Sequence, residues 1–118
     1  MTNVSVLQDL RADVNNFDKM DLREMQKFVT SFREQVEDIF EDLDVSSAIF
    51  KSYLDYILVS HIQHLDSFIR KLHDLEEDEA KFLKKVIRYH CTSIIDSFTY
   101  ACIALHHDEA HHDGKAAG

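Results

Sequence analysis

The sequence predicts an all-α fold, an antiparallel bundle of three long helices with a short N-terminal helix. The 118 residues include no proline, and the two glycines, Gly114 and Gly118, both lie close to the C-terminus. Sheets need turn residues at their hairpins, so this composition favours helices joined by short polar turns. Apolar residues also recur at alternating steps of three and four, which is typical of one buried helix face. We therefore expect one helical-bundle domain over residues 1–113, followed by a flexible tail over 114–118.

The first two helices are predicted over residues 1–17 and 21–43. Ser5 begins a capping-box pattern, so we expect the short first helix to start there and to dock onto the others. Asp21 and Glu24 form a second capping box, because the Asp21 side chain can accept an orphan backbone N–H while Glu24 reaches back to the cap. The second helix also carries an unbroken heptad seam of apolar residues. The seam consists of Leu22, Met25, Val29, Phe32, Val36, Ile39 and Leu43.

The two C-terminal helices are predicted over residues 45–73 and 76–112. Asp44 is the expected N-cap of the first of them, and Asp74 with Glu77 gives a third capping box at the start of the other. The connecting turns are too short for anything but antiparallel neighbours. The expected core positions are Phe50, Leu54, Ile57, Leu58, His61, Leu65, Phe68, Ile69 and Leu72 in the third helix, and Leu83, Val86, Ile87, His90, Ile94, Ile95, Phe98, Ala101, Cys102 and Leu105 in the fourth.

Charge and cysteine content limit the classes of function. The net charge of −9 at pH 7 argues against direct nucleic-acid binding, because contacts to phosphates need a basic face. Cys91 and Cys102 lie in one predicted helix, roughly 16 Å apart along its axis, so they cannot form a disulfide with each other. Free thiols suggest a reducing compartment, and neither a signal peptide nor an apolar run of about 18 residues is found. We therefore expect a cytoplasmic protein that does not bind a membrane.

Histidines provide two candidate metal sites. If the turn between the third and fourth helices is centred near residues 75–76, His61 and His90 lie at the same level of the hairpin, both on apolar seams. They would either hydrogen-bond to each other and fix the helix register, or hold a transition metal such as Zn or Ni. A tight zinc site usually needs three or four ligands, so the hydrogen-bonded pair is favoured and no cofactor is predicted. In the tail, His107 and His111 are spaced i, i+4 and could chelate a metal, or they belong to a solvated helix end.

Four acidic residues form a ladder on one face of the second helix. The acidic ladder consists of Glu34, Glu37, Asp38 and Glu41. It lies near the C-terminal end of the helix, where acids oppose the helix dipole, so folding alone gives no reason for acids at this position. A solvated face is the usual explanation of such a run, and a surface for a basic partner protein is the alternative.

One end of the bundle carries more apolar surface than three helices can cover. Over residues 48–59 the third helix is apolar nearly all the way round, and the fourth helix has off-seam apolar residues at the matching level. The surplus consists of Ile49, Tyr53, Tyr56, Tyr100 and Ile103. Either residues 1–17 cover these side chains or another chain does, because tyrosine-rich patches suit interfaces. In the second case we expect a homodimer or an obligate complex.

No set of residues predicts an enzyme. His90 and Cys91 are adjacent in a helix, so their side chains diverge, and no glycine-rich loop is present to bind phosphate. We therefore expect a small acidic protein-binding regulator: an inhibitor, antiactivator, immunity-type protein or chaperone-like protein that occupies a partner's surface. The alternative is a metal-binding helical bundle that uses His61 and His90 or the C-terminal histidines.

Overall fold

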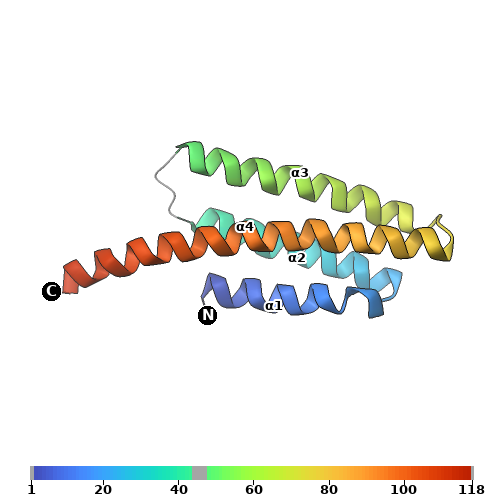
Figure 1. The fold of residues 1–118 in the computed structure, drawn as a ribbon, viewed down its shortest axis with the longest axis horizontal. Helices are drawn as coiled ribbons and strands as arrows, with labels where there is room; N and C mark the ends of the chain where they lie inside the picture. The colour runs from blue at the N-terminus through green and yellow to red at the C-terminus, as the bar shows by residue number, and fades with distance from the viewer. Residues whose placement is uncertain (1, 44–47, 118) are drawn as a thin grey trace.

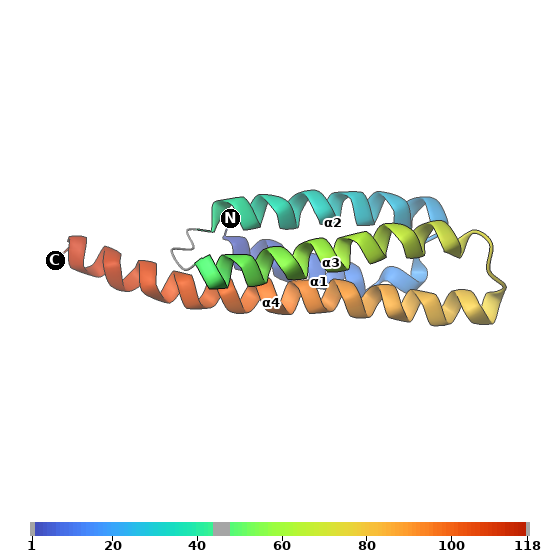
Figure 2. The ribbon, with the colours of Figure 1, turned by 90° about the horizontal axis from the view of Figure 1, so that it is seen from above.

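The structure confirms the all-α bundle. The computed structural model describes the backbone of residues 2–43 and 48–117, and the side chains of residues 2–43 and 48–104. The elements are α1 (Asn3–Asn15), the 3-10 helix η1 (Phe17–Lys19), α2 (Leu22–Asp42), α3 (Ala48–Leu72) and α4 (Glu77–Ala117). The three long helices run antiparallel to their sequence neighbours, and the short α1 lies beside them (Figures 1 and 2). Within the described backbone, no helix combines the length and the apolar character needed to cross a bilayer.

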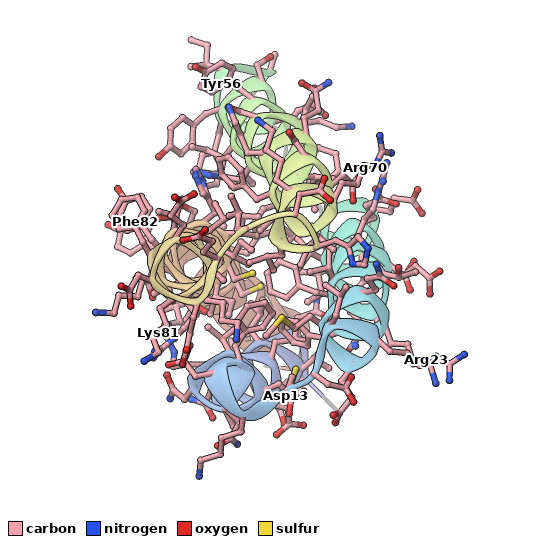
Figure 3. All side chains as sticks on the ribbon, turned by 90° about the vertical axis from the view of Figure 1, so that its right-hand side faces the viewer. Asp13, Arg23, Tyr56, Arg70, Lys81 and Phe82 are labelled. Atoms are coloured by element: carbon pink, nitrogen blue, oxygen red, sulfur yellow. The ribbon has the colours of Figure 1, made fainter. Side chains whose placement is uncertain are left out.

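The helices surround a shared interior. Helix α4 packs against α1 on one side and against α3 on the other, and α2 closes the ring by contacting both α3 and α1. Figure 3 views this ring along the helices, with α3 and α4 adjacent and α1 next to α4. Helix α1 has 13 residues and α3 has 25, so α1 extends roughly 20 Å where α3 extends roughly 37 Å. Figure 3 shows no described helix on the outer side of α3 and α4, where Tyr56 and Phe82 are labelled.

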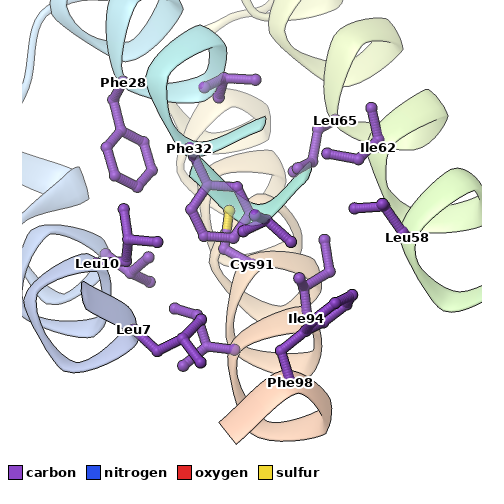
Figure 4. Packing of buried hydrophobic residues seen from close by; sticks show 14 of the residues in the cluster. Leu7, Leu10, Phe28, Phe32, Leu58, Ile62, Leu65, Cys91, Ile94 and Phe98 are labelled. Atoms are coloured by element: carbon purple, nitrogen blue, oxygen red, sulfur yellow. The ribbon is translucent and has the colours of Figure 1, made fainter. Parts of the chain in front are cut away.

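The core is built from apolar side chains that every helix contributes. Phe17 of η1, Phe32 of α2 and Phe98 of α4 are the largest of the fully buried side chains. Burying one such side chain stabilises the fold by about 1.5–3 kcal/mol. Figure 4 shows the packing of Leu7, Leu10, Phe28, Phe32, Leu58, Ile62, Leu65, Cys91, Ile94 and Phe98. Among the described side chains, no buried nitrogen or oxygen atom lacks a hydrogen-bond partner.

The starts of the first two helices agree only in part with the sequence prediction. Helix α1 begins at Asn3, because the Thr2 side chain accepts a hydrogen bond of 3.1 Å from the backbone N–H of Ser5. The predicted start at Ser5 is therefore wrong. Helix α2 begins with the expected capping box: the Glu24 N–H donates to Asp21 at 2.8 Å, and the Asp21 N–H donates to Glu24 at 3.2 Å.

The bounds of the last two helices also differ from the prediction. Helix α3 begins at Ala48, and its predicted cap, Asp44, lies outside the described residues. Asp74 lies in the turn, where its N–H donates to the carbonyl of Lys71, so the predicted capping box at Asp74 is wrong. Helix α4 begins at Glu77 and continues to Ala117, past the predicted end at residue 112 and into the predicted tail. Gly114 weakens a helix by about 1 kcal/mol without ending it.

His61 and His90 are half-buried at the edge of the core, within the buried or half-buried placement expected for a hydrogen-bonded pair. Helix α3 buries Ile62, which is 5% exposed, and leaves His61 half-buried. Helix α4 buries Cys91, which is 1% exposed, and leaves His90 half-buried. Each buried position is one residue away from the histidine, a rotation of about 100° around the helix. The rotation moves both imidazoles from the centre of the bundle to the seam where α3 meets α4.

We predict that Phe32→Ala lowers the free energy of unfolding by about 3–5 kcal/mol, because it leaves a cavity at the centre of the ring. Lys27→Ala on the exposed side of the same helix should change it by no more than about 0.5 kcal/mol. Urea unfolding followed by circular dichroism measures both. Equal losses in the two variants would contradict the placement of Phe32 in the core.

Candidate functional site

Large apolar side chains are exposed along the outer side of α3 and α4. They include all five residues of the predicted surplus, with exposures from 52% for Tyr53 to 85% for Ile49. Helix α1 packs on α4 and α2 and covers none of them, so the alternative in which residues 1–17 bury this surplus is wrong. Figure 3 shows Tyr56 and Phe82 on the side of the bundle opposite Arg70 and Arg23. We call the following set the aromatic face: Ile49, Tyr53, Tyr56, Phe82, Tyr89, Tyr100 and Ile103.

Two residues of the aromatic face, Phe82 and Tyr89, were not predicted from the sequence. Phe82 is 69% exposed and Tyr89 is 67% exposed. Phe82, Tyr89 and Tyr100 are separated by seven and eleven residues, which correspond to two and three helical turns. The three rings therefore project from one side of α4. This spacing is the signal that would have identified Phe82 and Tyr89, because it extends the surplus along the whole bundled length of α4.

The two seam histidines face one another, as predicted. His61 Nδ1 lies 2.6 Å from His90 Nδ1, and the ring centroids are 4.8 Å apart. At this distance one ring donates its N–H to the lone pair of the other, so the contact holds a single proton. The pair therefore ties α3 to α4 at one fixed register.

A third histidine, which the sequence patterns did not single out, joins the pair. His64 stacks on His90 with centroids 5.4 Å apart and planes 9° apart. Its Nδ1 lies 2.7 Å from the carbonyl oxygen of Ser60, and because a carbonyl only accepts, this nitrogen carries the proton. Tyr89 of the aromatic face has its ring 5.7 Å from His90, so the histidine cluster of His61, His64 and His90 borders that face. The separation of His61 and His64 by one helical turn was the available signal.

The geometry of the histidine cluster is that of hydrogen bonding rather than metal coordination. Among the side chains that the structure describes, no three His, Cys, Asp or Glu residues are placed to hold a metal ion. The parallel rings of His64 and His90 direct their in-plane lone pairs side by side rather than to one point. Two nitrogens on a tetrahedral zinc ion lie about 3.3 Å apart, so the pair would have to separate from 2.6 Å to bind one. The side chains of His107 and His111 lie outside the described residues.

Burial shifts the pKa values of three groups where α3 and α4 meet, namely His61, His90 and Cys91. Desolvation lowers the pKa of His61 below its usual 6.5, and the positive charge of His64 lowers it further. Desolvation likewise lowers the pKa of His90, with further lowering by His61 and His64. Burial raises the pKa of the Cys91 thiol to about 12, so Cys91 is a neutral, shielded thiol at physiological pH.

The acidic ladder divides into two parts. Glu37 accepts a bond of 3.1 Å from Arg33, and Arg33 also bonds Asp66 of α3 at 3.0 Å, so Glu37 belongs to a contact between two helices. This pairing was not expected from the sequence. The other three ladder residues are exposed and make no ion pair with any described side chain. These three, which we call the free acids, are Glu34, Asp38 and Glu41.

One free acid borders a groove that leads toward the aromatic face. Glu41 and Glu37 line a shallow groove of about 290 Å³ between α2 and α3, together with Asp55 and Val59. Asp55 and Val59 also line the adjoining hollow beside Tyr56. Carboxylates and exposed apolar side chains therefore form one continuous surface at this end of the bundle.

Comparisons of the chain with family models, with curated proteins and with solved structures gave no match.

We predict that the fold loses stability as the pH falls from 7.5 to 5. His61 and His90 have pKa values below 6.5 in the folded state, so the unfolded chain binds protons more readily. Their contribution is fully present above pH 6.5 and is lost as the pH falls through the folded pKa values. Urea unfolding at a series of pH values measures the effect.

The double variant His61→Leu with His90→Leu should unfold with a weaker pH dependence and should keep the fold, because an apolar pair needs no proton. His73→Leu, which changes an exposed histidine in the turn, serves as the control. If the double variant keeps the pH dependence of the wild type, the histidine pair is not its cause.

Proposed function

We propose that this chain is a small acidic regulator that binds another protein and acts by occupying the surface of that partner, as an inhibitor, antiactivator, immunity-type protein or chaperone-like protein does. The aromatic face is the observation that carries the proposal. Five aromatic rings and two isoleucines are exposed on two adjacent helices, although the fold has a complete core without them. Single exposed apolar residues are ordinary, but seven large ones along one side of two adjacent helices favour a binding surface.

The chemistry of the aromatic face supports a protein rather than a lipid or nucleic-acid partner. Four of its seven members are Tyr53, Tyr56, Tyr89 and Tyr100, whose rings bury apolar area while the hydroxyl can still bond to water or to a partner. Tyrosine is enriched in the interfaces of protein complexes for this reason. A net charge of −9 repels phosphate groups, which nucleic acids and anionic membranes both present.

The free acids supply the charge complementarity of the proposed complex. They are exposed on the last turns of α2, where their charges oppose the dipole of the helix that carries them. Charges of this kind accelerate association with an oppositely charged surface more than they strengthen the final complex. A partner with a basic surface beside an apolar anchor would match both the free acids and the nearby end of the aromatic face.

A second candidate function is metal binding, and the contact between His61 and His90 is the observation that favours it. Opening of the pair from 2.6 Å to about 3.3 Å would admit one zinc or nickel ion between two ligands. His107 and His111 would be a separate chelating pair. Metal analysis of the untagged protein tests this candidate, because a stoichiometric metal that His90→Leu removes would establish it.

We predict that neutralising the free acids weakens capture of the partner and leaves the fold intact. The triple variant carries Glu34→Gln, Asp38→Asn and Glu41→Gln, and it retains Glu37 because that residue pairs with Arg33. Its melting temperature should be unchanged or slightly higher, because like-charge repulsion and the opposed dipole are relieved. Its association with the partner purified from the native cell should be slower and less dependent on salt.

A matched control removes the same charge elsewhere. Asp9→Asn, Asp13→Asn and Glu76→Gln change three exposed acids on α1 and in the turn before α4, none of which lines the hollow beside Phe82. This control should associate at nearly the wild-type rate. Equal slowing in both triple variants would show a general effect of net charge instead of a specific surface. A wild-type chain that captures no protein from its own cell would overturn the proposed function.

A further inference from the structure

The two ends of the aromatic face differ in shape. At one end Tyr53, Tyr56 and Tyr100 project from α3 and α4 with at least half of their surface exposed. At the other end, beside the turn between the two helices, the surface forms a hollow of about 610 Å³. Its apolar lining consists of Phe68, Leu75, Phe82 and Leu83. Lys71, Asp74, Asp78 and Glu79 line the rest of the hollow. One face therefore carries both apolar projections and a hollow with an apolar part and a charged part.

The projections and the hollow lie at equal distances from the histidine cluster. On α4, Tyr100 and Phe82 lie nine residues on either side of Cys91. On α3, Tyr56 and Phe68 lie six residues on either side of Ile62. Contact between the neighbouring His61 and His90 places these two midpoints within about 3 Å of one level, because the helices run in opposite directions and each midpoint is one residue from its histidine. A rotation of 180° about an axis that crosses both helices at this level would exchange the two ends of the face.

We propose that a second copy of this chain occupies the aromatic face, related to the first by such a twofold axis. The proposal rests on the proposed function, in that it takes the aromatic face to be a protein-binding surface, and it names the occupant. Helix α4 then lies against α4 of the second copy in the reverse direction, and α3 lies against α3. Tyr100 of each copy meets the hollow beside Phe82 of the other, so every contact occurs twice, as in other isologous dimers.

The size of the face suits a dimer. Its five aromatic side chains are 52% to 75% exposed, which corresponds to on the order of 600 Å² of surface. Ile49 and Ile103, which are 85% and 55% exposed, add to this area. A standard interface buries about 800 Å² on each partner, whereas the largest patch on an ordinary monomer is about 300–600 Å². The face is therefore large enough for a stable contact between two copies.

Charge also favours the reversed arrangement. Lys85 and Asp96 are exposed on α4 at positions nearly symmetric about the proposed axis, so each Lys85 lies at the level of Asp96 in the second copy. Asp96 already accepts a bond from Arg11, and Lys85 makes no ion pair with a described side chain of its own chain. The free acids lie on α2, outside the aromatic face, so the two copies meet without opposing them. They remain accessible to a basic partner, which would then bind the dimer through the free acids without using the aromatic face.

Light scattering with a charge exchange tests the proposal. The wild type at micromolar concentration should have twice the mass of one chain. Tyr100→Lys and Phe82→Glu should each be monomeric. A homodimer of either variant would place a charged side chain in both contacts between residue 100 of one copy and the hollow beside residue 82 of the other. An equimolar mixture of the two variants should form a heterodimer. In this heterodimer one contact places the lysine at position 100 of one variant against the glutamate at position 82 of the other. The second contact joins the unchanged Tyr100 and Phe82. A parallel dimer with like ends together gives no such rescue.

Controls separate the possible outcomes. Gln26→Lys, on the exposed side of α2, should leave the wild-type dimer intact, and melting curves should show all variants folded. A monomeric wild type overturns the proposal, and a dimer that survives both substitutions overturns it by placing the contact elsewhere. Two monomeric variants that fail to combine overturn the reversed twofold arrangement. Capture of a different protein by a monomeric wild type would leave the proposed function standing while the dimer fails.

Discussion

The position of α4 between α1 and α3 is the constraint on which the rest of the structure depends. A helix with neighbours on two sides must bury a wide arc, and α4 does so through Ile87, Cys91, Ile94, Ile95 and Phe98. This arc fixes the rotation of α4 about its axis. It therefore sets His90 at the seam with α3, directs Arg88 to Asp18 of η1 at 2.9 Å, and leaves Phe82, Tyr89 and Tyr100 on the remaining side. The aromatic face is thus a consequence of which sides of α4 are already occupied.

Sequence patterns predicted the elements well and their rotations less well. The heptad seam and the Asp21–Glu24 capping box identified α2 correctly, because both signals are local. The level of His61 against His90 was also predictable, since a short turn fixes the register of a hairpin. The burial of Ile62 and Cys91 instead of these histidines was not predictable. An apolar stripe defines a face only to within about one residue, and the exact rotation depends on where the two neighbouring helices lie.

In the candidate site too, features that depend on one helix could be predicted from the sequence, whereas contacts between two helices could not. The surplus of apolar residues near Tyr53 and Tyr56 was visible in the sequence because those residues interrupt a polar face. His64 was not singled out, because its contact with His90 depends on how α3 and α4 meet. The acidic ladder looked uniform in the sequence, yet Glu37 lies where α2 meets α3 and pairs with Arg33. A run of charges on one helix therefore divides according to the helix that packs beside it.

The histidine cluster and the aromatic face are physically compatible with burial under a second chain. Covering a polar atom is costly when it has no partner, by about 1–3 kcal/mol for each unsatisfied group. His61 and His90 already share one proton, and His64 donates to the Ser60 carbonyl oxygen at 2.7 Å, so the Nδ1 of each ring is bonded within its own chain. A covering chain must leave the second ring nitrogen, Nε2, open to water or supply its partner. Tyrosine hydroxyls at the rim retain access to water. A partner that covers this region would gain the apolar area of the rings while the histidines beneath keep the hydrogen bonds that they make in the free chain.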